Sequence, residues 1–206
     1  MKRTVSVLCC ACVLALFAAD GGKEDLRMWT IHREQGAFFA NDPSVCRLAS
    51  GEVLVAFSGN RDAQVCPWGA IKLIRSADGG ETWSEPTVVF DGILDDRAPV
   101  LRLEKDGSLS LTWQTSTAFR NLNVIYRRHY GKIPQGAVRK ALGTFKVRST
   151  DGGKTWSEPE RIADRPDAAG AGASCTLGDG TVLTVASKPD KPLGKPVLVA
   201  TKGKAR

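Results

Sequence analysis

The sequence has few of the residues from which metal and redox sites are built. It contains only two histidines, His32 and His129, and beyond the first 21 residues it has no Cys-x-x-Cys pair. A zinc site needs clustered His or Cys ligands, and this chain offers little with which to build one. We therefore expect neither a metal ion nor another cofactor.

Convincing helices are also missing. No stretch combines helix caps with an apolar period of about 3.6 residues, apart from a weak pattern over 134–142. The composition, 42% hydrophobic and 25% charged, is that of an ordinary globular protein and excludes low-complexity and disordered classes. The chain is therefore expected to be an all-β protein.

The first 21 residues have the pattern of a secretory signal peptide. Basic residues at Lys2 and Arg3 precede an apolar run over 5–19, and small residues follow it. The run is short for a membrane span, which needs about 20 apolar residues. We expect cleavage between Ala18 and Gly22, a secreted or periplasmic protein without a membrane span, and a folded domain over 22–206.

The cysteines leave two interpretations open. Cys9, Cys10 and Cys12 lie in the leader, where a lipoprotein anchor is the alternative to simple cleavage. Three cysteines remain in the mature chain: Cys46, Cys66 and Cys175. Cys46 and Cys66 fall in one predicted sheet and could form a disulfide, or all three could be buried free thiols.

Charge gives no sign of a nucleic-acid partner. The formal net charge is +7, but the basic residues are scattered, with local clusters only at Arg127-Arg128 and over 202–206. Such a distribution is typical of a solvated surface, and we expect no nucleic acid to bind.

An octapeptide occurs twice and organises the chain. The stretch 76–83 (SADGGETW) returns as 149–156 (STDGGKTW), and both copies follow an Arg and precede Ser-Glu-Pro. In each copy the Asp can accept backbone N–H bonds, the Gly pair can take positive φ angles, and the Trp can pack on a neighbouring sheet. The residues expected to shape these turns are Ser76, Asp78, Gly80, Thr82 and Trp83, and Ser149, Asp151, Gly153, Thr155 and Trp156.

Alternating apolar runs around the octapeptides predict a repeated pattern of four strands. The expected strands are 28–32, 44–48, 53–57, 70–74, 87–90, 99–103, 109–113, 144–147, 159–162, 172–177, 182–186 and 196–200. After the first of these strands, they fall into repeats over about 38–92, 93–165 and 166–206, of which the third lacks an octapeptide. Repeated four-stranded antiparallel sheets predict β-propeller blades. An open arc would expose blade faces, so we expect a truncated ring or association through open blade edges.

The octapeptide resembles the Asp box, or BNR repeat, of sialidases, and the resemblance covers most of 38–187. It implies an all-β propeller of the sialidase type, with about three four-stranded blades present of six. It also implies a secreted glycoside hydrolase acting on terminal sugars such as sialic acid, incomplete and inactive as this chain alone. The alternative is a non-catalytic Asp-box propeller that binds glycans or proteins, because these boxes lie at the blade periphery.

The resemblance also places candidate site residues. Sialidases begin the first inner strand with Arg-Ile-Pro; here Pro43 fits that spacing, but Asn41 and Asp42 replace Arg and Ile. The missing Arg would be one of three that clamp the sialic acid carboxylate. Asp62 stands where the family has its acid/base Asp, whereas no match to the family's Tyr/Glu pair can be placed.

Seven residues make up the predicted site. Asp62 is the candidate proton donor, and the candidate substrate-binding residues are Asp42, Arg61, Gln64, Asp96, Arg97 and Arg120. The alternatives are a surface ion pair for Arg61 and Asp62, a solvated turn around Asp96, and an irregular surface excursion for the long stretch around Arg120.

Overall fold

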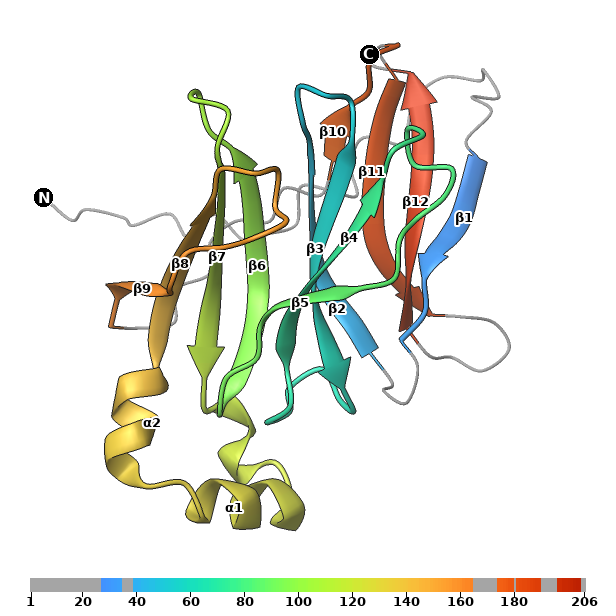
Figure 1. The fold of residues 1–206 in the computed structure, drawn as a ribbon. Coiled ribbons are helices and arrows are strands. Elements are labelled where there is room, and N and C mark those ends of the chain that lie inside the picture. Colours follow the sequence, from blue (N-terminus) through green and yellow to red (C-terminus); the bar gives the residue numbers. More distant parts are fainter. Residues whose placement is uncertain (1–26, 35–38, 165–173, 180, 190–195, 205–206) are drawn as a thin grey trace, which may run out of the picture.

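The computed structural model describes residues 27–34, 39–164, 174–179, 181–189 and 196–204. Their strands form three four-stranded antiparallel sheets (Figure 1). The predicted signal peptide lies outside the described residues. Among the helices that the structure describes, none is long and apolar enough to cross a membrane.

Each sheet is named by its place in the chain. The first sheet contains β2 (Phe39–Arg47), β3 (Val53–Arg61), β4 (Ala70–Ser76) and β5 (Thr87–Phe90). The second sheet contains β6 (Asp95–Leu103), β7 (Leu109–Ser116), β8 (Gly143–Ser149) and β9 (Glu160–Ala163). The third sheet contains β10 (Ser174–Thr176), β11 (Thr181–Pro189), β12 (Pro196–Lys204) and β1 (Arg27–His32).

The third sheet is completed by the N-terminal strand. β1 pairs antiparallel with β12, with Met28 opposite Thr201 and Trp29 opposite Ala200. The third repeat, which the sequence pattern leaves with three strands, therefore takes its fourth strand from the other end of the described chain.

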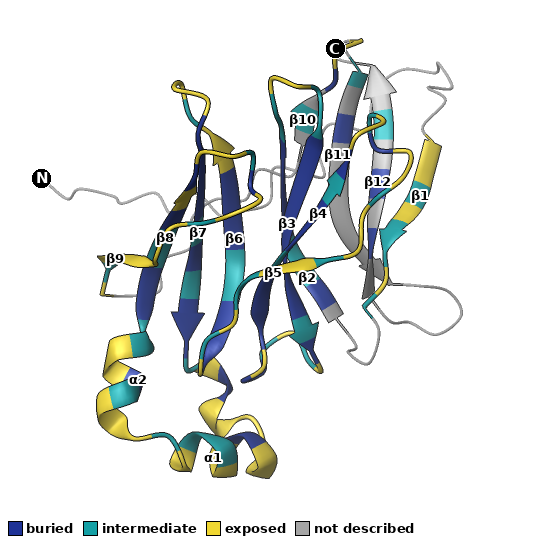
Figure 2. Cartoon of the chain, in the orientation of Figure 1, coloured by how far each residue is buried: buried dark blue, intermediate teal, exposed yellow. Residues whose placement is uncertain are grey.

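The first sheet lies between the other two (Figures 1 and 2). Alternate β3 residues point to opposite faces. Val55 and Phe57 pack with Leu183 of the third sheet, whereas Leu54 packs with Leu111 of the second. The two apolar layers on either side of β3 hold the stack together.

The connection between β7 and β8 contains helices. These are η1 (Ala118–Asn121), α1 (Val124–Gly131) and α2 (Gln135–Ala141). The sequence pattern predicted only a weak helix in the region of α2, and α1 was missed. The sequence does contain one signal for α1. Asn123 caps the helix, because its side chain accepts a 2.8 Å hydrogen bond from the Tyr126 amide.

The two octapeptides form matching turns. Asp78 accepts hydrogen bonds from the Thr82 amide at 3.0 Å and the Ser76 hydroxyl at 2.7 Å, and Asp151 makes the equivalent bonds at the same two distances with Thr155 and Ser149. Both Gly pairs have positive φ. The turn around Gly152 lies against Leu48, at the end of the stack that carries the strand hairpins.

A disulfide between Cys46 and Cys66 is not formed. Both are buried free thiols, and they belong to different apolar clusters. Cys46 lies between the first and second sheets, whereas Cys66 packs beneath the helices with Tyr126. The hypothesis failed because it placed the loop cysteine in the sheet.

Candidate functional site

Four charged residues meet near one end of the first and second sheets. Arg61 Nη1 lies 2.8 Å from Asp95 Oδ1, and both side chains are fully buried. Arg97 then links Asp95 to Asp42, with nitrogen-to-oxygen distances of 3.8 and 3.9 Å. We call Asp42, Arg61, Asp95 and Arg97 the ionic cluster.

The ionic cluster holds most of the buried side-chain polar atoms that lack a hydrogen-bond partner. In the described part of the chain these atoms are Trp29 Nε1, Asp42 Oδ2, Arg61 Nε and both oxygens of Asp95. The Asp95 charge is nevertheless compensated, because Arg61 and Arg97 lie 2.8 and 3.8 Å from its two oxygens. An unmade buried hydrogen bond costs about 1–3 kcal/mol, so the atoms without a partner are held in the cluster at a cost.

The rest of the cluster is firmly held. Arg61 donates to the Ser58 hydroxyl at 2.7 Å and to the Gln64 carbonyl at 2.7 Å. Burial raises the pKa of Asp95, and the Arg61 charge opposes that rise. Arg97 and Asp42 are the partly exposed members, with side chains 20% and 36% exposed, so they form the solvent side of the cluster.

Asp96 belongs to a separate network. Its carboxylate accepts hydrogen bonds from the Gly92 amide at 2.7 Å, from Trp113 Nε1 at 3.2 Å, and from the Thr115 hydroxyl. Burial raises the pKa of Asp96 to about 7, although these three bonds oppose the rise. The buried Asp96 carboxylate therefore holds the backbone at Gly92, between β5 and β6, through a hydrogen bond.

Three non-glycine residues near this end have left-handed backbone conformations. Asp42 (φ 53°) and Ala98 (φ 51°) each precede a proline, in β2 and β6, and Asn60 (φ 59°) lies near the end of β3. A residue before proline normally takes an extended conformation, so Asp42 and Ala98 store strain of about 1–3 kcal/mol each. Both β2 and β6 are irregular here, since their pairing registers shift around Asp42 and Ala98. Strain of this kind gathers at functional sites, which supports the choice of this end.

Asp62 lies in the loop between β3 and β4 and faces the helices. It accepts hydrogen bonds from the Tyr126 hydroxyl at 2.6 Å and from Trp68 Nε1 at 3.0 Å. The Trp68 ring packs edge-on against His129, with centroids 4.5 Å apart. Burial, and then the bond to Asp62, raise the pKa of Tyr126 far above its usual value, so its phenol stays protonated.

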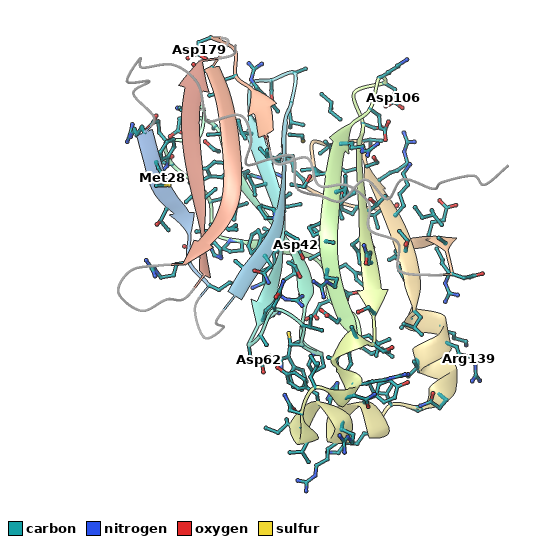
Figure 3. All side chains as sticks on the ribbon, turned by 180° about the vertical axis from the view of Figure 1, so that it is seen from behind. Met28, Asp42, Asp62, Asp106, Arg139 and Asp179 are labelled. Atoms are coloured by element: carbon teal, nitrogen blue, oxygen red, sulfur yellow. The ribbon has the colours of Figure 1, made fainter. Side chains whose placement is uncertain are left out.

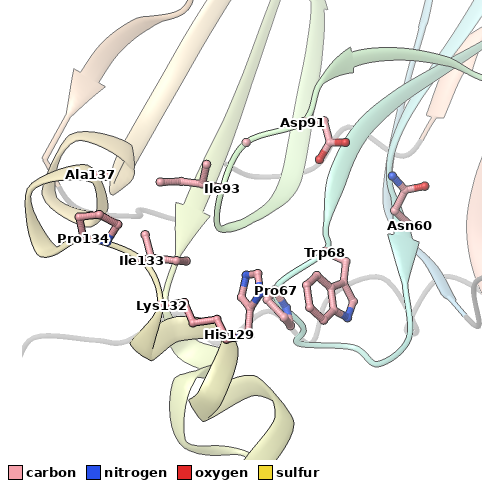
Figure 4. A pocket seen from close by; sticks show the side chains of 11 residues that line it. Asn60, Pro67, Trp68, Asp91, Ile93, His129, Lys132, Ile133, Pro134 and Ala137 are labelled. Carbon is pink, nitrogen blue, oxygen red and sulfur yellow. The ribbon is translucent and has the colours of Figure 1, made fainter.

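A cavity of about 530 Å³ opens beside this loop (Figure 4). Trp68 and His129 line one part of it, and Ile93, Ile133 and Ala137 line another. The cavity therefore combines an exposed indole and a few polar groups with an apolar wall, a typical lining for small-molecule sites.

The structure brings some of the predicted site residues together and separates others. Asp42, Arg61 and Arg97 share the ionic cluster, and Asp62 lies in the loop that follows Arg61. Gln64 contributes its backbone carbonyl. The remaining two lie elsewhere: Asp96 is buried in its own network, and Arg120 is exposed on η1. Their roles in substrate binding stay predictions.

Asp95 and Tyr126 are not among the seven residues of the predicted site. Asp95 stands two positions before Arg97 on one strand, and residues so spaced share a face, which is a signal that the sequence did contain. Tyr126 had no such signal, because its contact with Asp62 depends on how α1 packs. The described residues contain no group of three or more His, Cys, Asp or Glu that could hold a metal ion.

Comparisons with known proteins give structural neighbours only. No protein-family model and no curated protein matches the sequence. Solved structures that resemble the chain include a protein of unknown function from Dyadobacter fermentans DSM 18053, with 22% identity over 84% of this chain and a TM-score of 0.49. Others are a Hadza microbial sialidase, with 22% identity over 79% and a TM-score of 0.47, and a family 117 glycoside hydrolase from Zobellia galactanivorans, with 14% identity over 82% and a TM-score of 0.45.

The neighbours thus include sialidases and other glycoside hydrolases, all at low identity. This chain spans 54%, 35% and 55% of the three structures named above, so it corresponds to about half of their length or less.

Proposed function

We propose that this chain is part of an exported, sialidase-like glycoside hydrolase that binds a terminal acidic sugar at the ionic cluster. In this proposal the three sheets are blades of a sialidase-type propeller and the octapeptides are its Asp boxes. The observation that carries the proposal is the partly exposed Arg97 beside the partly exposed Asp42, on the solvent side of the buried Arg61–Asp95 ion pair. The seven-residue prediction from the sequence supports the same end of the stack.

Arg97 is suited to hold the acidic group of the sugar. Its guanidinium lies 3.8 and 3.9 Å from two carboxylates, longer than a charge-assisted hydrogen bond. A guanidinium in this position can turn toward a ligand carboxylate and bind it through two parallel N–H bonds. The Asp42 side chain, which is 36% exposed, can accept a bond from a sugar hydroxyl.

Asp62 is the proposed proton donor, and Trp68 the proposed stacking surface. The indole of Trp68 is 37% exposed and lines the cavity, so it offers an apolar plate to a sugar ring. Donation by Asp62 requires its protonated form and a ligand oxygen within hydrogen-bond reach. Tyr126 and Trp68 hold the carboxylate in place for that contact.

A fluorogenic sialoside tests this proposal. We expect Asp62→Asn to lower the rate at least about 100-fold if Asp62 is the proton donor. Arg97→Ala should mainly raise KM, because a binding contact is lost. Arg139→Ala, which removes an exposed cation on α2, is the control and should leave both unchanged. Measurable turnover that is equal in Asp62→Asn and the unsubstituted chain would refute the role of Asp62.

Glycan binding without hydrolysis is the second candidate. Both Asp62 oxygens already accept hydrogen bonds, and the raised pKa of Tyr126 makes its phenol a poor nucleophile. A sialylated glycan that binds equally to the unsubstituted chain and to Asp62→Asn, with no turnover by either, would favour this function. Binding that Arg97→Ala leaves unchanged would exclude the ionic cluster under both candidates.

A further inference from the structure

The helical connection between β7 and β8 carries charge of one sign only. No Asp or Glu occurs in 107–150. Six Lys or Arg side chains lie in the connection, and all are exposed: Arg120, Arg127, Arg128, Lys132, Arg139 and Lys140. None of them forms an ion pair within the part of the chain that the structure describes. Cations that are scattered along the sequence therefore lie together on η1, α1 and α2, at one end of the molecule (Figure 1).

Exposed apolar side chains gather in the same segment. Leu122, Val124 and Ile125 are 60%, 56% and 65% exposed. The other exposed large apolar residues of the described chain lie singly on separate strands and loops: Met28, Trp68, Val88, Ile93, Leu103 and Ile162. Single exposed apolar residues are normal on a protein surface, whereas a contiguous group indicates contact with a partner.

Both kinds of side chain point outward from α1. Tyr126 is buried and packs in an apolar cluster, so it marks the inner face of the helix. A helix turns about 100° per residue, so Val124 and Arg128, two positions before and after Tyr126, lie on the opposite face. Ile125 and Arg127 flank that face. We define the basic-apolar patch as Arg120, Leu122, Val124, Ile125, Arg127 and Arg128.

The basic-apolar patch lies on helices that project beyond the strand ends, and not on the face of a sheet (Figure 1). Neighbouring blades of the proposed propeller would meet the second sheet through its faces. They leave the patch to another partner, so docking there is compatible with a complete propeller.

We infer that the basic-apolar patch docks this chain on a membrane surface that contains anionic phospholipids. Arginines near such a surface bind the lipid phosphates, and their flexible stems can lie alongside apolar groups. The three exposed aliphatic side chains can enter the boundary between the headgroups and the acyl chains. The patch therefore offers one group for each of the two layers of a lipid surface.

Other polyanions fit the basic-apolar patch less well. A soluble anionic polysaccharide offers the charge but no apolar region for Leu122, Val124 and Ile125. An acidic protein would need a groove matched to a projecting helix, whereas lipids rearrange around it. The combination of cations and aliphatic side chains on a projecting tip thus favours a lipid surface.

Docking through α1 would bring the candidate acid close to the membrane. Tyr126, on the inner face of the same helix, donates its hydrogen bond to Asp62. Under the proposed function, on which this step rests, the site would then face sugars that are carried on lipids. The docking itself does not depend on that function.

Sedimentation with lipid vesicles tests this inference. The chain should bind vesicles of equimolar phosphatidylcholine and phosphatidylglycerol but not vesicles of phosphatidylcholine alone, and added salt should weaken the binding. Arg127→Gln with Arg128→Gln should weaken it about 30-fold, because each cation near an anionic membrane contributes about fivefold. Lys105→Gln with Lys154→Gln removes the same charge from exposed positions at the hairpin end of the stack. This matched control should change the affinity by less than about twofold, because salt screens distant charges.

The aliphatic residues distinguish a lipid surface from other polyanions. Val124→Ser with Ile125→Ser keeps every charge and replaces only exposed side chains, so the fold should be kept. Vesicle binding should fall at least about tenfold, because the inserted apolar groups are lost. Unchanged vesicle binding by this variant, or no binding by the unsubstituted chain, would overturn the inference. Binding of the unsubstituted chain to soluble heparin but not to vesicles would assign the patch to an anionic polysaccharide instead.

An environment-sensitive fluorophore locates the contact. In a background in which the native cysteines are replaced by Ser or Ala, the label is attached at Ile125→Cys or at Lys105→Cys. The mixed vesicles should shift the emission to shorter wavelength only for the label at position 125. A shift only for the label at position 105 would mean that the chain docks through its other end. Because no measurement here uses a sialoside, failure of the docking and failure of the proposed glycosidase function can be told apart.

Discussion

Tyr126 donates a 2.6 Å hydrogen bond to Asp62, although 64 positions separate the two residues in the chain. The bond joins α1, which lies in the connection between β7 and β8, to the loop between β3 and β4. The helical insertion of the second sheet thus positions the candidate acid carried by the first. Figure 3 shows Asp62 near the helical end, away from the hairpin turns at Asp106 and Asp179.

Tyr126→Phe tests this positioning. The variant should keep the fold, because the ring still packs with Phe119 and one lost hydrogen bond costs about 0.5–1.5 kcal/mol. Binding or turnover of the sialoside should fall, because only Trp68 then holds Asp62. Thermal unfolding and sialoside assays measure the two effects separately. Sialoside binding and turnover equal to those of the unsubstituted chain would show that this hydrogen bond does not position Asp62 for its role.

Arg61→Met tests the buried ion pair. The substitution leaves the buried Asp95 carboxylate with only the more distant Arg97 as its cation, which should lower the free energy of unfolding by up to about 3–5 kcal/mol. Adding Asp95→Asn to Arg61→Met should recover a large part of that loss. Urea titration measures both, and a double variant that is no more stable than Arg61→Met would contradict the pairing.

Asp96 should make stability depend on pH. Its folded-state pKa is about 7, whereas an unfolded Asp titrates near about 3.9, so the folded state binds one more proton between these values. Its contribution to stability is therefore fully present below about pH 4 and is lost as pH rises through 7.

Asp96→Asn isolates this effect. The free energy of unfolding of the native chain, measured against that of Asp96→Asn, should fall between pH 4 and 7 by up to about 1.4 kcal/mol per unit. The Asn side chain can still accept from the Gly92 amide, so the fold is kept. Parallel pH curves for the two proteins would show that Asp96 stays ionised in the fold.

Local sequence patterns could predict the strands and turns. The Asp-Gly-Gly turns and the alternating runs depend on neighbours a few residues apart, and such short-range chemistry can be read from a sequence. The pairing of β1 with β12 could not be predicted in this way, because the sequence of either strand is compatible with pairing to many other strands. α1 was missed as well, because its one local signal is the Asn123 cap and the helix also depends on the packing of its Tyr126 in an apolar cluster.

The candidate site was only partly predictable for the same reason. Arg61 and Arg97 could be selected as polar residues next to apolar strands. That Asp95 faces both arginines while Asp96 faces Trp113 depends on the register shift between Arg97 and Val100 in β6. A shift of one residue exchanges the two faces of a strand, so the spacing places Asp95 and Arg97 on one face but does not show which face is turned toward Arg61.

Cys46 and Cys66 should both be unreactive in the folded chain. Burial raises the pKa of the Cys46 thiol to about 12, and it also raises the pKa of Cys66. A thiol reagent near neutral pH should therefore leave both unmodified in the folded chain and modify them in urea. Peptide mapping by mass spectrometry distinguishes them from other cysteines. A Cys46–Cys66 cross-linked peptide from freshly purified protein would contradict the structure.

Two glycine substitutions in the turns distinguish the cost of a left-handed backbone conformation from the cost of a steric clash with the added Cβ. Gly107 has φ +81° and no atom within 4 Å of an added Cβ, so Gly107→Ala should cost only the left-handed backbone penalty of about 1–2 kcal/mol. Gly80 has φ +91°, and a Cβ there would lie 3.2 Å from Leu183 of the third sheet, so Gly80→Ala should cost more. Equal losses in urea titration would mean that the first octapeptide turn does not pack on the third sheet. A larger loss for Gly80→Ala that Leu183→Ala reduces in a double-mutant cycle would confirm that contact.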